Sequence, residues 1–382
     1  MSFETDAIHA GNRPDKAYGA ISVPIYQTST FAFEDVGKTR GYDYSRSANP
    51  TRHVLEQTVA RLEGGKAGFA CGSGMAAASL IIHMLMAGDH VLAVEDIYGG
   101  TFRLFADVMT RFGLEFSFIK MANREAIEQA IRPNTRMMWL ETPSNPLLHI
   151  VDLEMCGEVA KKHKLIGVMD NTFATPYFLR PMEFGIDIVM HSTTKYLGGH
   201  SDVVGGIVVT SSDELAQRIA FFHNALGGIA GPFDSWLVLR GIETLPLRMR
   251  QHEANATAVA SMLQDHPAVE RVYYPGLPDH PGHALAHRQM KGFGGMVSFE
   301  IKGGLDAANR FLGAVKVFTL AESLGGITSL AGHPMTQSHA SMTTEQRAKV
   351  GIKDNLIRLS VGLENIDDLI GDLKQALKAA QG

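Results

Sequence analysis

Cysteine is scarce in this chain, and long apolar runs and an excess of positive charge are missing. Only two of the 382 residues are cysteine, Cys71 and Cys156, which is too few for a disulfide framework and fits a reducing compartment. The formal net charge of −5 provides no general attraction to a polyanion such as nucleic acid. No run of about eighteen apolar residues occurs, so we expect no membrane-spanning helix.

The composition is that of an ordinary soluble protein, with 45% hydrophobic and 20% charged residues. A chain of 382 residues is long enough for two or three domains with a large core. Residues 1–20 are polar and lack the apolar core of a signal peptide. We therefore expect a cytoplasmic protein.

Residues 1–50 are expected to form an extended arm. Pro14, Pro24 and Pro50 are scattered through this stretch, which has little helical periodicity. An arm of this length needs a surface to lie on, and a neighbouring subunit would provide one.

Beyond the arm, residues 51–241 are expected to form an α/β domain. Apolar residues at helical spacing follow Thr51, and Gly64 and Gly65 end that helix. Short apolar runs then alternate with amphipathic stretches, which is typical of a largely parallel sheet. The expected strands are 90–96, 136–143, 165–171, 187–193 and 205–211.

The remaining residues, 242–382, are expected to form a smaller α+β domain. A helical stretch spans 247–263, and shorter strands follow at 271–275 and 294–302. The last helix has its apolar residues on one face, and Asn365 with Asp368 predicts an N-terminal cap of the capping-box type.

The run MHSTTKYLGGHSD, residues 190–202, contains an unusual lysine. Lys195 follows a short apolar segment, hydroxyl side chains crowd it at Ser192, Thr193 and Thr194, and glycines come after it. Because burying an ammonium without a partner is costly, lysine normally stays at the solvated surface. A lysine in this setting indicates a site, and Schiff-base chemistry is the first to consider.

The run FACGSGMAAAS, residues 69–79, predicts a phosphate-binding turn, because Gly72 and Gly74 would place backbone N–H groups at a helix N-terminus. The same run spells G-x-G-x-x-A, and Glu95 and Asp96 follow about twenty residues later, so a dinucleotide-binding fold is an alternative. That alternative leaves the unusual lysine unexplained. A glycine-rich turn that merely packs a helix on a sheet is a further alternative.

Two more candidate residues follow expected strands. Asp170 ends an apolar strand, where open α/β sheets place ligand groups, and its carboxylate could hold a cationic ring nitrogen. Tyr98 follows another strand, and its ring could stack on a ligand. Taken singly, Asp170 could be a turn or cap residue, and Tyr98 a half-buried tyrosine at a strand end.

Taken together, these residues match the needs of pyridoxal phosphate. This cofactor requires a lysine for its aldehyde, an acid for its pyridinium nitrogen and donors for its phosphate. Lys195 and Asp170 meet the first two needs, and the glycine turn meets the third. Ser192 and Thr194 add hydroxyl donors, and Tyr98 adds a ring for stacking.

The chain resembles the Cys/Met-metabolism family of fold-type-I pyridoxal-phosphate enzymes, which includes the cystathionine lyases, cystathionine γ-synthase and methionine γ-lyase. The resemblance covers nearly the whole chain and implies an aspartate-aminotransferase-like fold, with a large, mostly parallel-sheet domain and a smaller C-terminal domain. It also implies a homo-oligomer, at least a dimer and up to a tetramer. Eight blocks in order carry it: YDYSRSANPTR (42–52), CGSGMAA (71–77), DIYGGTFR (96–103), ETPSNP (141–146), DNTFATPYF (170–178), HSTTKYLGGHSDVVGG (191–206), TLAESLGGITSL (319–330) and IRLSVGLE (357–364).

The resemblance implies which residues bind the cofactor. Lys195 forms the Schiff base and later shuttles protons, Asp170 pairs with the pyridine nitrogen, and Tyr98 stacks on the ring and acts as an acid or base. The residues implied to hold the phosphate within one subunit are Gly74, Met75, Ser192 and Thr194. Two residues of the arm are implied to reach the phosphate of the neighbouring subunit's cofactor: Tyr44 and Arg46.

The resemblance also implies how the substrate is held. Arg358 binds the substrate α-carboxylate with both arms of its planar guanidinium. Asn145 and Ser323 line the same pocket, and Arg103 is a further candidate contact to the substrate. The expected partner is therefore a small sulfur amino acid, and neither nucleic acid nor a membrane.

Within the family, the implied reaction is the α,γ-elimination of cystathionine or a related sulfur amino acid, with 2-oxobutanoate, ammonia and a thiol as products. A γ-synthase that joins an O-acylhomoserine to cysteine remains an alternative, and so does a β-lyase. Thr328 stands where many members have a glutamate associated with the distal amino group of cystathionine. Gly100 stands where methionine γ-lyases have a cysteine, which argues against that member.

Other signals are weaker. His280, His283 and His287 mimic the spacing of metal ligands, but Pro278 and Pro281 interrupt any helix there, so no metal site is expected. A nicotinamide-dependent oxidoreductase and a non-catalytic scaffold of this fold are the hypotheses from other functional classes.

Overall fold

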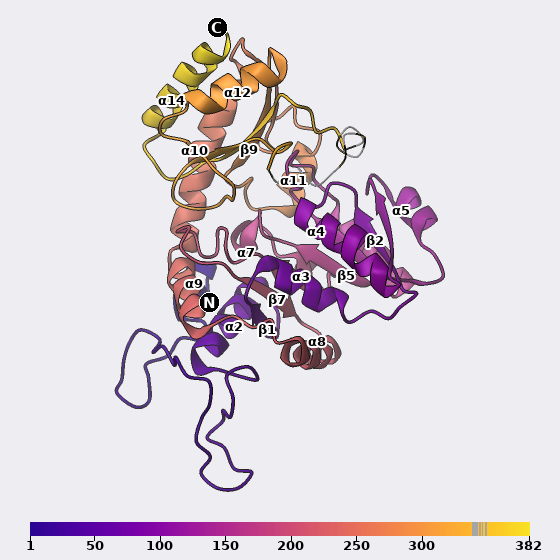
Figure 1. Cartoon of the computed structure of the whole chain (residues 1–382), viewed down its shortest axis with the longest axis vertical. Helices are drawn as coiled ribbons and strands as arrows, with labels where there is room; N and C mark the ends of the chain where they lie inside the picture. Colours follow the sequence, from indigo (N-terminus) through magenta and orange to yellow (C-terminus); the bar gives the residue numbers. More distant parts are fainter. Residues whose placement is uncertain (338–342, 344, 346, 348–349) are drawn as a thin grey trace. The chain divides into compact units, whose positions relative to one another are not determined.

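The computed structural model of the chain describes every residue except 338–342, 344, 346, 348 and 349 (Figure 1). The described residues form two compact units, each made of two separate stretches of chain. The first unit comprises residues 1–86 and 166–246, and the second comprises 87–165 and 247–382. The predicted division into 1–50, 51–241 and 242–382 stays a prediction.

The first unit is built on four strands in the order β1-β7-β6-β5. Their bounds are Ala67–Cys71 for β1, Gly206–Thr210 for β7, Ile188–His191 for β6 and Ile166–Asp170 for β5. β5 and β6 are parallel, whereas β7 is antiparallel to both β6 and β1. Because β5 and β6 run in the same direction, their carboxyl ends meet at one edge of the sheet.

The long helices of the first unit are α2 (Pro50–Glu63), α3 (Gly74–Ile82), α8 (Asp213–Leu226) and α9 (Pro232–Glu243). Helix α2 begins where the side chain of Asn49 accepts the amides of Thr51 and Arg52, which are otherwise unpaired in a first turn. It ends at Gly64, whose φ of 77° is the left-handed conformation that glycine adopts without strain. Short elements of this unit are α1 (Phe3–His9), α7 (Thr175–Phe178) and η3 (Pro181–Phe184).

The second unit contains two sets of strands. One has the order β4-β2-β3, all parallel, with bounds Thr135–Glu141, His90–Val94 and Glu115–Ile119. Around these strands the chain forms α4 (Gly99–Arg103), η1 (Leu104–Val108), η2 (Met109–Phe112), α5 (Arg124–Ala130) and α6 (Leu153–His163).

The other set is a five-stranded sheet with the order β10-β11-β12-β9-β8. These strands are Thr319–Leu320, Leu330–Gly332, Leu356–Ser360, Met296–Ile301 and Val269–Tyr273. Its helices are α10 (Leu245–Gln264), α11 (His283–Gln289), α12 (Gly304–Ala314) and α14 (Ile366–Ala380). Phe299 of β9, Phe311 of α12 and Leu373 of α14 belong to one buried apolar cluster between sheet and helices.

The predicted strands and long helices agree with the observed ones to within about two residues, and two local predictions were wrong. The arm is not extended throughout, because Phe3–His9 forms α1, which packs against α2 and α9. The last helix begins at Ile366, but Asn365 accepts from the amide of Asp367 rather than from that of Asp368, so the cap is not a capping box.

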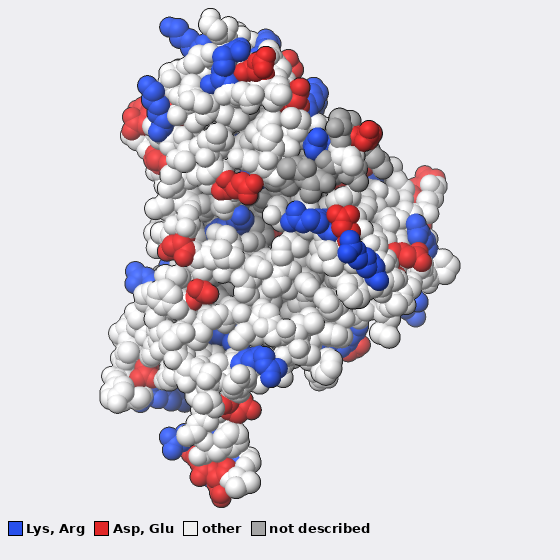
Figure 2. All heavy atoms as spheres, viewed as in Figure 1, with Lys and Arg blue, Asp and Glu red and all other residues white. Residues whose placement is uncertain are grey.

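No helix in the described part of the chain is long and apolar enough to cross a membrane. Figure 2 shows positive and negative side chains interspersed on the visible face, which agrees with the small net charge of the sequence.

Candidate active site

The carboxyl end of β5 in the first unit carries Asp170, which is buried with 9% of its surface exposed. Its Oδ1 accepts from the amide of Thr172 at 3.0 Å and from the hydroxyl of Thr172 at 2.6 Å. Burial raises the pKa of the Asp170 carboxyl, while these two hydrogen bonds and the charge of His191 act in the opposite direction. A cationic group beside this carboxyl would favour its ionised form, so Asp170 fits a pyridinium nitrogen.

Thr172 connects Asp170 to the second predicted site residue, Ser192. The amide of Ser192 donates to the Thr172 hydroxyl at 2.9 Å. Sequence reasoning missed Thr172, although an aspartate followed two residues later by a hydroxyl residue is a known turn pattern. One threonine hydroxyl thus holds the ends of β5 and β6 together at the predicted site.

Ser192 lies directly against the glycine turn. A Cβ added to Gly74 would be 2.8 Å from Ser192 Cβ and 3.0 Å from its Oγ, so only glycine allows this approach. Gly74 is the first residue of α3, where the side chain of Ser73 takes the amide of Ala76 at 3.0 Å. In the described part of the chain the amides of Gly74 and Met75 have no acceptor, which makes them donors for an anion at the helix N-terminus.

Lys195 and Thr194 follow β6 in a series of turns. The amide of Lys195 donates to the carbonyl of Ser192 at 3.3 Å, and its carbonyl accepts from Gly199 at 2.7 Å, so the backbone of this half-buried lysine is held in place. The Thr194 hydroxyl accepts from the amide of Gly205 at 3.0 Å. The first unit therefore brings together six predicted residues: Gly74, Met75, Asp170, Ser192, Thr194 and Lys195. A lysine, a buried acid, a hydroxyl and free amides at one sheet edge fit the chemistry of pyridoxal phosphate.

A buried glutamate behind this site was not predicted. Glu63, the last residue of α2, is fully buried, and its Oε1 accepts from Asn171 Nδ2 at 2.8 Å and bonds His191 Nε2 at 2.5 Å. Asn171 directly follows Asp170, and His191 directly precedes Ser192. The signal was present in the sequence, because Glu63 lies four residues after the buried Val59 and so on the apolar face of its helix.

In the second unit, Arg358 of β12 is buried, with 7% of its surface exposed. Its Nη1 donates to Asn145 Oδ1 at 3.0 Å, and its Nη2 donates to the backbone carbonyl of Ser323 at 3.0 Å. Ser323 has a φ of 91°, which is rare for a residue with a side chain and occurs at functional sites. Three predicted substrate residues are thus brought together, with Ser323 contacting the arginine through its backbone.

Tyr98 and Arg103 also belong to the second unit, at the two ends of α4. The amide of Tyr98 donates to Glu141 Oε2 at 2.9 Å, and 39% of the tyrosine surface is exposed, so its ring is available to a ligand. Arg103 is exposed and has no ion pair with any residue that the structure describes. Nothing in its own surroundings fixes its guanidinium to a substrate pocket.

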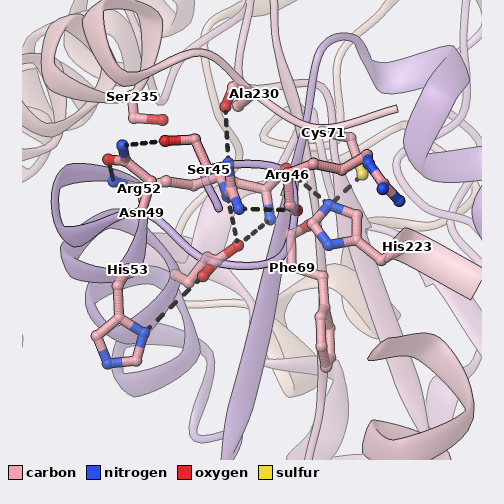
Figure 3. Close-up of polar contacts among 12 residues, drawn as sticks. Ser45, Arg46, Asn49, Arg52, His53, Phe69, Cys71, His223, Ala230 and Ser235 are labelled. Atoms are coloured by element: carbon pink, nitrogen blue, oxygen red, sulfur yellow. Dashed lines mark hydrogen bonds and ion pairs between the residues drawn. The ribbon is translucent and has the colours of Figure 1, made fainter. Parts of the chain in front are cut away.

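The arm residues Tyr44 and Arg46 lie together in the first unit. The Arg46 guanidinium is 5.6 Å from the centroid of the Tyr44 ring. Arg46 Nη1 donates to the carbonyl of Asn224 at 2.7 Å and to its Oδ1 at 3.0 Å. Figure 3 shows Arg46 among the polar contacts around Arg52. Their predicted reach to a neighbouring subunit stays a prediction.

Two alternatives find no support in the geometry. β1 is antiparallel to β7, whereas the dinucleotide-binding fingerprint belongs to a parallel strand–helix–strand unit. Among the described residues no three His, Cys, Asp or Glu side chains could hold one metal ion. Of the three spaced histidines, His280 accepts from the amide of Gly282, and His283 bonds the carbonyl of Pro275.

Comparison with known proteins assigns the family. A family model described as Cys/Met metabolism PLP-dependent enzyme matches residues 4–378. The cystathionine gamma-lyase of Bacillus subtilis (strain 168) is 51% identical over 378 residues, which cover 99% of this chain and 100% of the relative. The cystathionine beta-lyase of Lactococcus lactis subsp. cremoris (strain MG1363) is 50% identical over 377 residues, which cover 99% of each protein. The crystal structure of cystathionine gamma synthase from Xanthomonas oryzae pv. oryzae, in complex with aminoacrylate and cysteine, has a TM-score of 0.98 and 46% identity, and covers 100% of this chain and 99% of that chain.

The fold and the site together define a pyridoxal-phosphate-dependent enzyme of the α/β class. The chain belongs to the Cys/Met-metabolism family of these enzymes, since the family match spans nearly its whole length. The predicted fold class, family and cofactor are thereby confirmed. Relatives with similar identity are named for three different reactions, so identity alone does not select one of them.

Proposed function

We propose that this protein is a carbon–sulfur lyase that acts on cystathionine or a related sulfur amino acid by α,γ-elimination. The family match over residues 4–378 carries the class of reaction, a conversion of a sulfur amino acid with pyridoxal phosphate. Within that class, the relative named cystathionine gamma-lyase makes α,γ-elimination the first reaction to test. In the reaction, cystathionine and water give cysteine, 2-oxobutanoate and ammonia. The bond that breaks joins sulfur to Cγ of the four-carbon half of the substrate.

Lys195 is proposed to hold the cofactor and to move the protons of this reaction. Bound pyridoxal phosphate supplies an electron sink for the charge that develops at the substrate Cα. The Nζ amine of Lys195 removes the proton from Cα and then helps to move a proton at Cβ. Asp170 keeps the ring nitrogen protonated, and its burial at the end of β5 supports this role because a buried carboxylate favours a cationic partner.

The remaining roles are proposed from the resemblance, with support from local geometry. Met75, Ser192 and Thr194 bind the phosphate with Gly74, whose amide stands at the start of α3. Tyr98 stacks on the ring. Arg358 binds the substrate α-carboxylate, supported by the way that Asn145 and Ser323 hold its guanidinium, and Arg103 makes a further substrate contact.

Product identification tests the proposed reaction. With cystathionine as the substrate, we expect 2-oxobutanoate and cysteine, whereas pyruvate and homocysteine would show a β-lyase and overturn the proposal. Lys195→Ala should abolish turnover and the cofactor's covalent attachment, which borohydride traps on the wild-type peptide. Lys161→Ala, a change at a lysine of α6 outside the site, is the matched control and should leave both unchanged.

A γ-synthase is the second candidate. Thr328 stands where many family members have the glutamate associated with the distal amino group of cystathionine, so a strict preference for cystathionine as the substrate is weakened. A solved γ-synthase also matches the chain with 46% identity. If O-acylhomoserine and cysteine are converted to cystathionine faster than cystathionine is cleaved, the synthase is the correct assignment.

We further propose a cytoplasmic homo-oligomer, at least a dimer and by resemblance a tetramer, in which Tyr44 and Arg46 reach the neighbouring subunit's cofactor. The arm supports this because it exposes large apolar side chains, including Tyr18 at 96%, Ile21 at 78% and Val36 at 100%. Light scattering of the purified protein tests the oligomer, and a monomer that binds cofactor and turns over substrate would overturn it.

A further inference from the structure

Arg52, in the first turn of α2, is a buried arginine at a point where segments of the first unit meet (Figure 3). Only 1% of its surface is exposed. Its Nη2 donates to the carbonyl of Arg46 at 3.2 Å, and its Nη1 donates to the carbonyl of Ala230 at 3.4 Å. A buried guanidinium needs partners to offset its desolvation, and these two partners belong to the arm and to the loop after α8.

Glu56, one turn further along α2, pairs with Arg52 and contacts a third segment. Its Oε1 lies 3.5 Å from Arg52 Nε and accepts from the amide of Ala70 at 3.0 Å. Ala70 belongs to β1, which leads into the phosphate turn at Ser73 and Gly74. The pair is therefore bonded to the strand that carries the turn.

The loop after α8 completes the connection. Ala230 donates to the carbonyl of Ala70 at 3.0 Å, and Gly72 donates to the carbonyl of Gly228 at 2.9 Å. This loop is thus fixed to both β1 and the phosphate turn, and Arg52 donates to it from the other side. Arg46 of the arm and the phosphate turn are therefore connected by one hydrogen-bond network, which is buried at Arg52.

We propose that Arg52 and Glu56 are positioning residues for cofactor binding, which hold Arg46 of the arm and the phosphate turn of the same subunit in one fixed arrangement. The inference rests on the proposed function, in which the turn binds one phosphate and Arg46 reaches the phosphate of the neighbouring subunit's cofactor. Within a dimer, the phosphate turn belongs to one cofactor site and Arg46 to the other. Because Arg52 and Glu56 contact both segments, a shift of this pair changes both cofactor sites.

The charge on Glu56 makes this coupling depend on pH. Burial raises the pKa of Glu56 to about 7, against the opposing effect of Arg52. Above that pH the carboxylate is ionised and paired, and below it the group takes up a proton, which leaves the buried guanidinium without its counter-charge.

Other titratable groups face the pair from the neighbouring elements. Burial raises the pKa of Cys71 on β1 to about 12 and lowers that of His223 on α8 to about 4. Burial also raises the pKa of Tyr42 in the arm and lowers that of His53, whose Nδ1 is 4.0 Å from Glu56 Oε2. Burial thus moves the pKa of Glu56 toward neutrality, and Glu56 is the group that pairs with Arg52.

The test measures the dissociation constant of pyridoxal phosphate from the full-length protein, after the cofactor has been removed and titrated back. Arg52→Lys keeps a positive charge but loses the planar fork, and Glu56→Gln keeps an acceptor for Ala70 but loses the charge. We expect each variant to raise the constant about tenfold at a pH above 7. Arg218→Lys is the matched control, because Arg218 also donates to a backbone carbonyl in this unit, that of Met84, and should change the constant less than about twofold.

The pH profile separates positioning from a merely structural role. The wild-type and Glu56→Gln constants should converge about one pH unit below 7, where Glu56 is neutral, and diverge about one unit above it. Curves that stay parallel over this range would overturn the proposal, whatever the variant does to the melting temperature.

Arg46→Ala distinguishes this inference from the proposed function. An unchanged constant in Arg46→Ala would show that the role proposed for Arg46 is wrong, and Arg52→Lys then tests the contact to the turn alone. A raised constant in Arg46→Ala with an unchanged one in Arg52→Lys would show that the pair positions nothing. Circular dichroism checks that each variant is folded. If Arg52→Lys does not fold, the dissociation constant measured for Glu56→Gln provides the same test.

Discussion

The buried carboxylate of Glu63 provides the sharpest test of how the first unit is held together behind its candidate site. One oxygen, Oε1, binds both Asn171 and His191, which flank Asp170 and Ser192 on neighbouring strands. Two substitutions separate the shape of this side chain from its charge. Glu63→Gln retains an acceptor oxygen, whereas Glu63→Met fills the same space and accepts nothing.

The expected cost follows from these two hydrogen bonds. A bond to a charged group contributes about 1.5–3 kcal/mol and a neutral bond about 0.5–1.5 kcal/mol, so Glu63→Gln should cost about 2 kcal/mol. Glu63→Met removes both bonds and leaves two buried donors unpaired, which should cost about 3–5 kcal/mol. With an unfolding entropy of about 2.1 cal/mol/K per residue, a chain of this length loses about 1.2 °C of Tm per kcal/mol.

Thermal unfolding followed by circular dichroism is the assay. We expect Tm to fall by about 2–3 °C for Glu63→Gln and by about 4–6 °C for Glu63→Met. Glu128→Met is the control, because Glu128 makes an exposed ion pair with Lys162, and such pairs contribute little. A Glu63→Met variant as stable as the wild type, or one no less stable than Glu63→Gln, would refute the reasoning.

Three further predictions concern the binding sites and the thiols. Gly74→Ala should raise the dissociation constant of pyridoxal phosphate about 5- to 150-fold by equilibrium titration, since its Cβ would lie 2.8 Å from Ser192 Cβ and overpacking costs about 1–3 kcal/mol. Gly371→Ala is the control: a Cβ there has no neighbour within 4 Å in α14, so this variant should leave binding unchanged and raise Tm. Arg358→Lys should raise KM for the amino-acid substrate at least about tenfold in steady-state kinetics, because a lysine cannot reproduce the planar fork of a guanidinium. Arg310→Lys is the control and should leave KM unchanged, since Arg310 donates to the carbonyl of Ala380. Equal KM values in the wild type and Arg358→Lys would contradict the role proposed for Arg358 in binding the substrate carboxylate. Cys71 and Cys156 are buried, and burial raises the pKa of each thiol to about 12, so iodoacetamide should label neither in the native protein and both after denaturation, as mass spectrometry can show.

The sequence by itself determined many of the larger elements and the candidate residues of the first unit's site. Strands such as β5 and β6 are short, uninterrupted apolar runs, and α2 begins at an asparagine cap and ends at a glycine, so local physics suffices to find them. Asp170 and Lys195 were identifiable because each follows such a run, where the chain reaches the ligand edge of a sheet. Motif blocks in a fixed order then identified the family and its cofactor.

Only the tertiary structure decided which residues, distant in the sequence, form hydrogen bonds with the residues in and around the candidate site. Glu63 is 108 positions from Asn171, and Arg52 is 178 from Ala230, and no local periodicity encodes a contact at such separations. The sequence also does not indicate that β1 is antiparallel to β7, or that Ser323 contacts Arg358 through its backbone carbonyl. A hydrophobic pattern states that a residue is buried, but the partner of a buried charge is set by the packing of elements that the chain brings together only on folding.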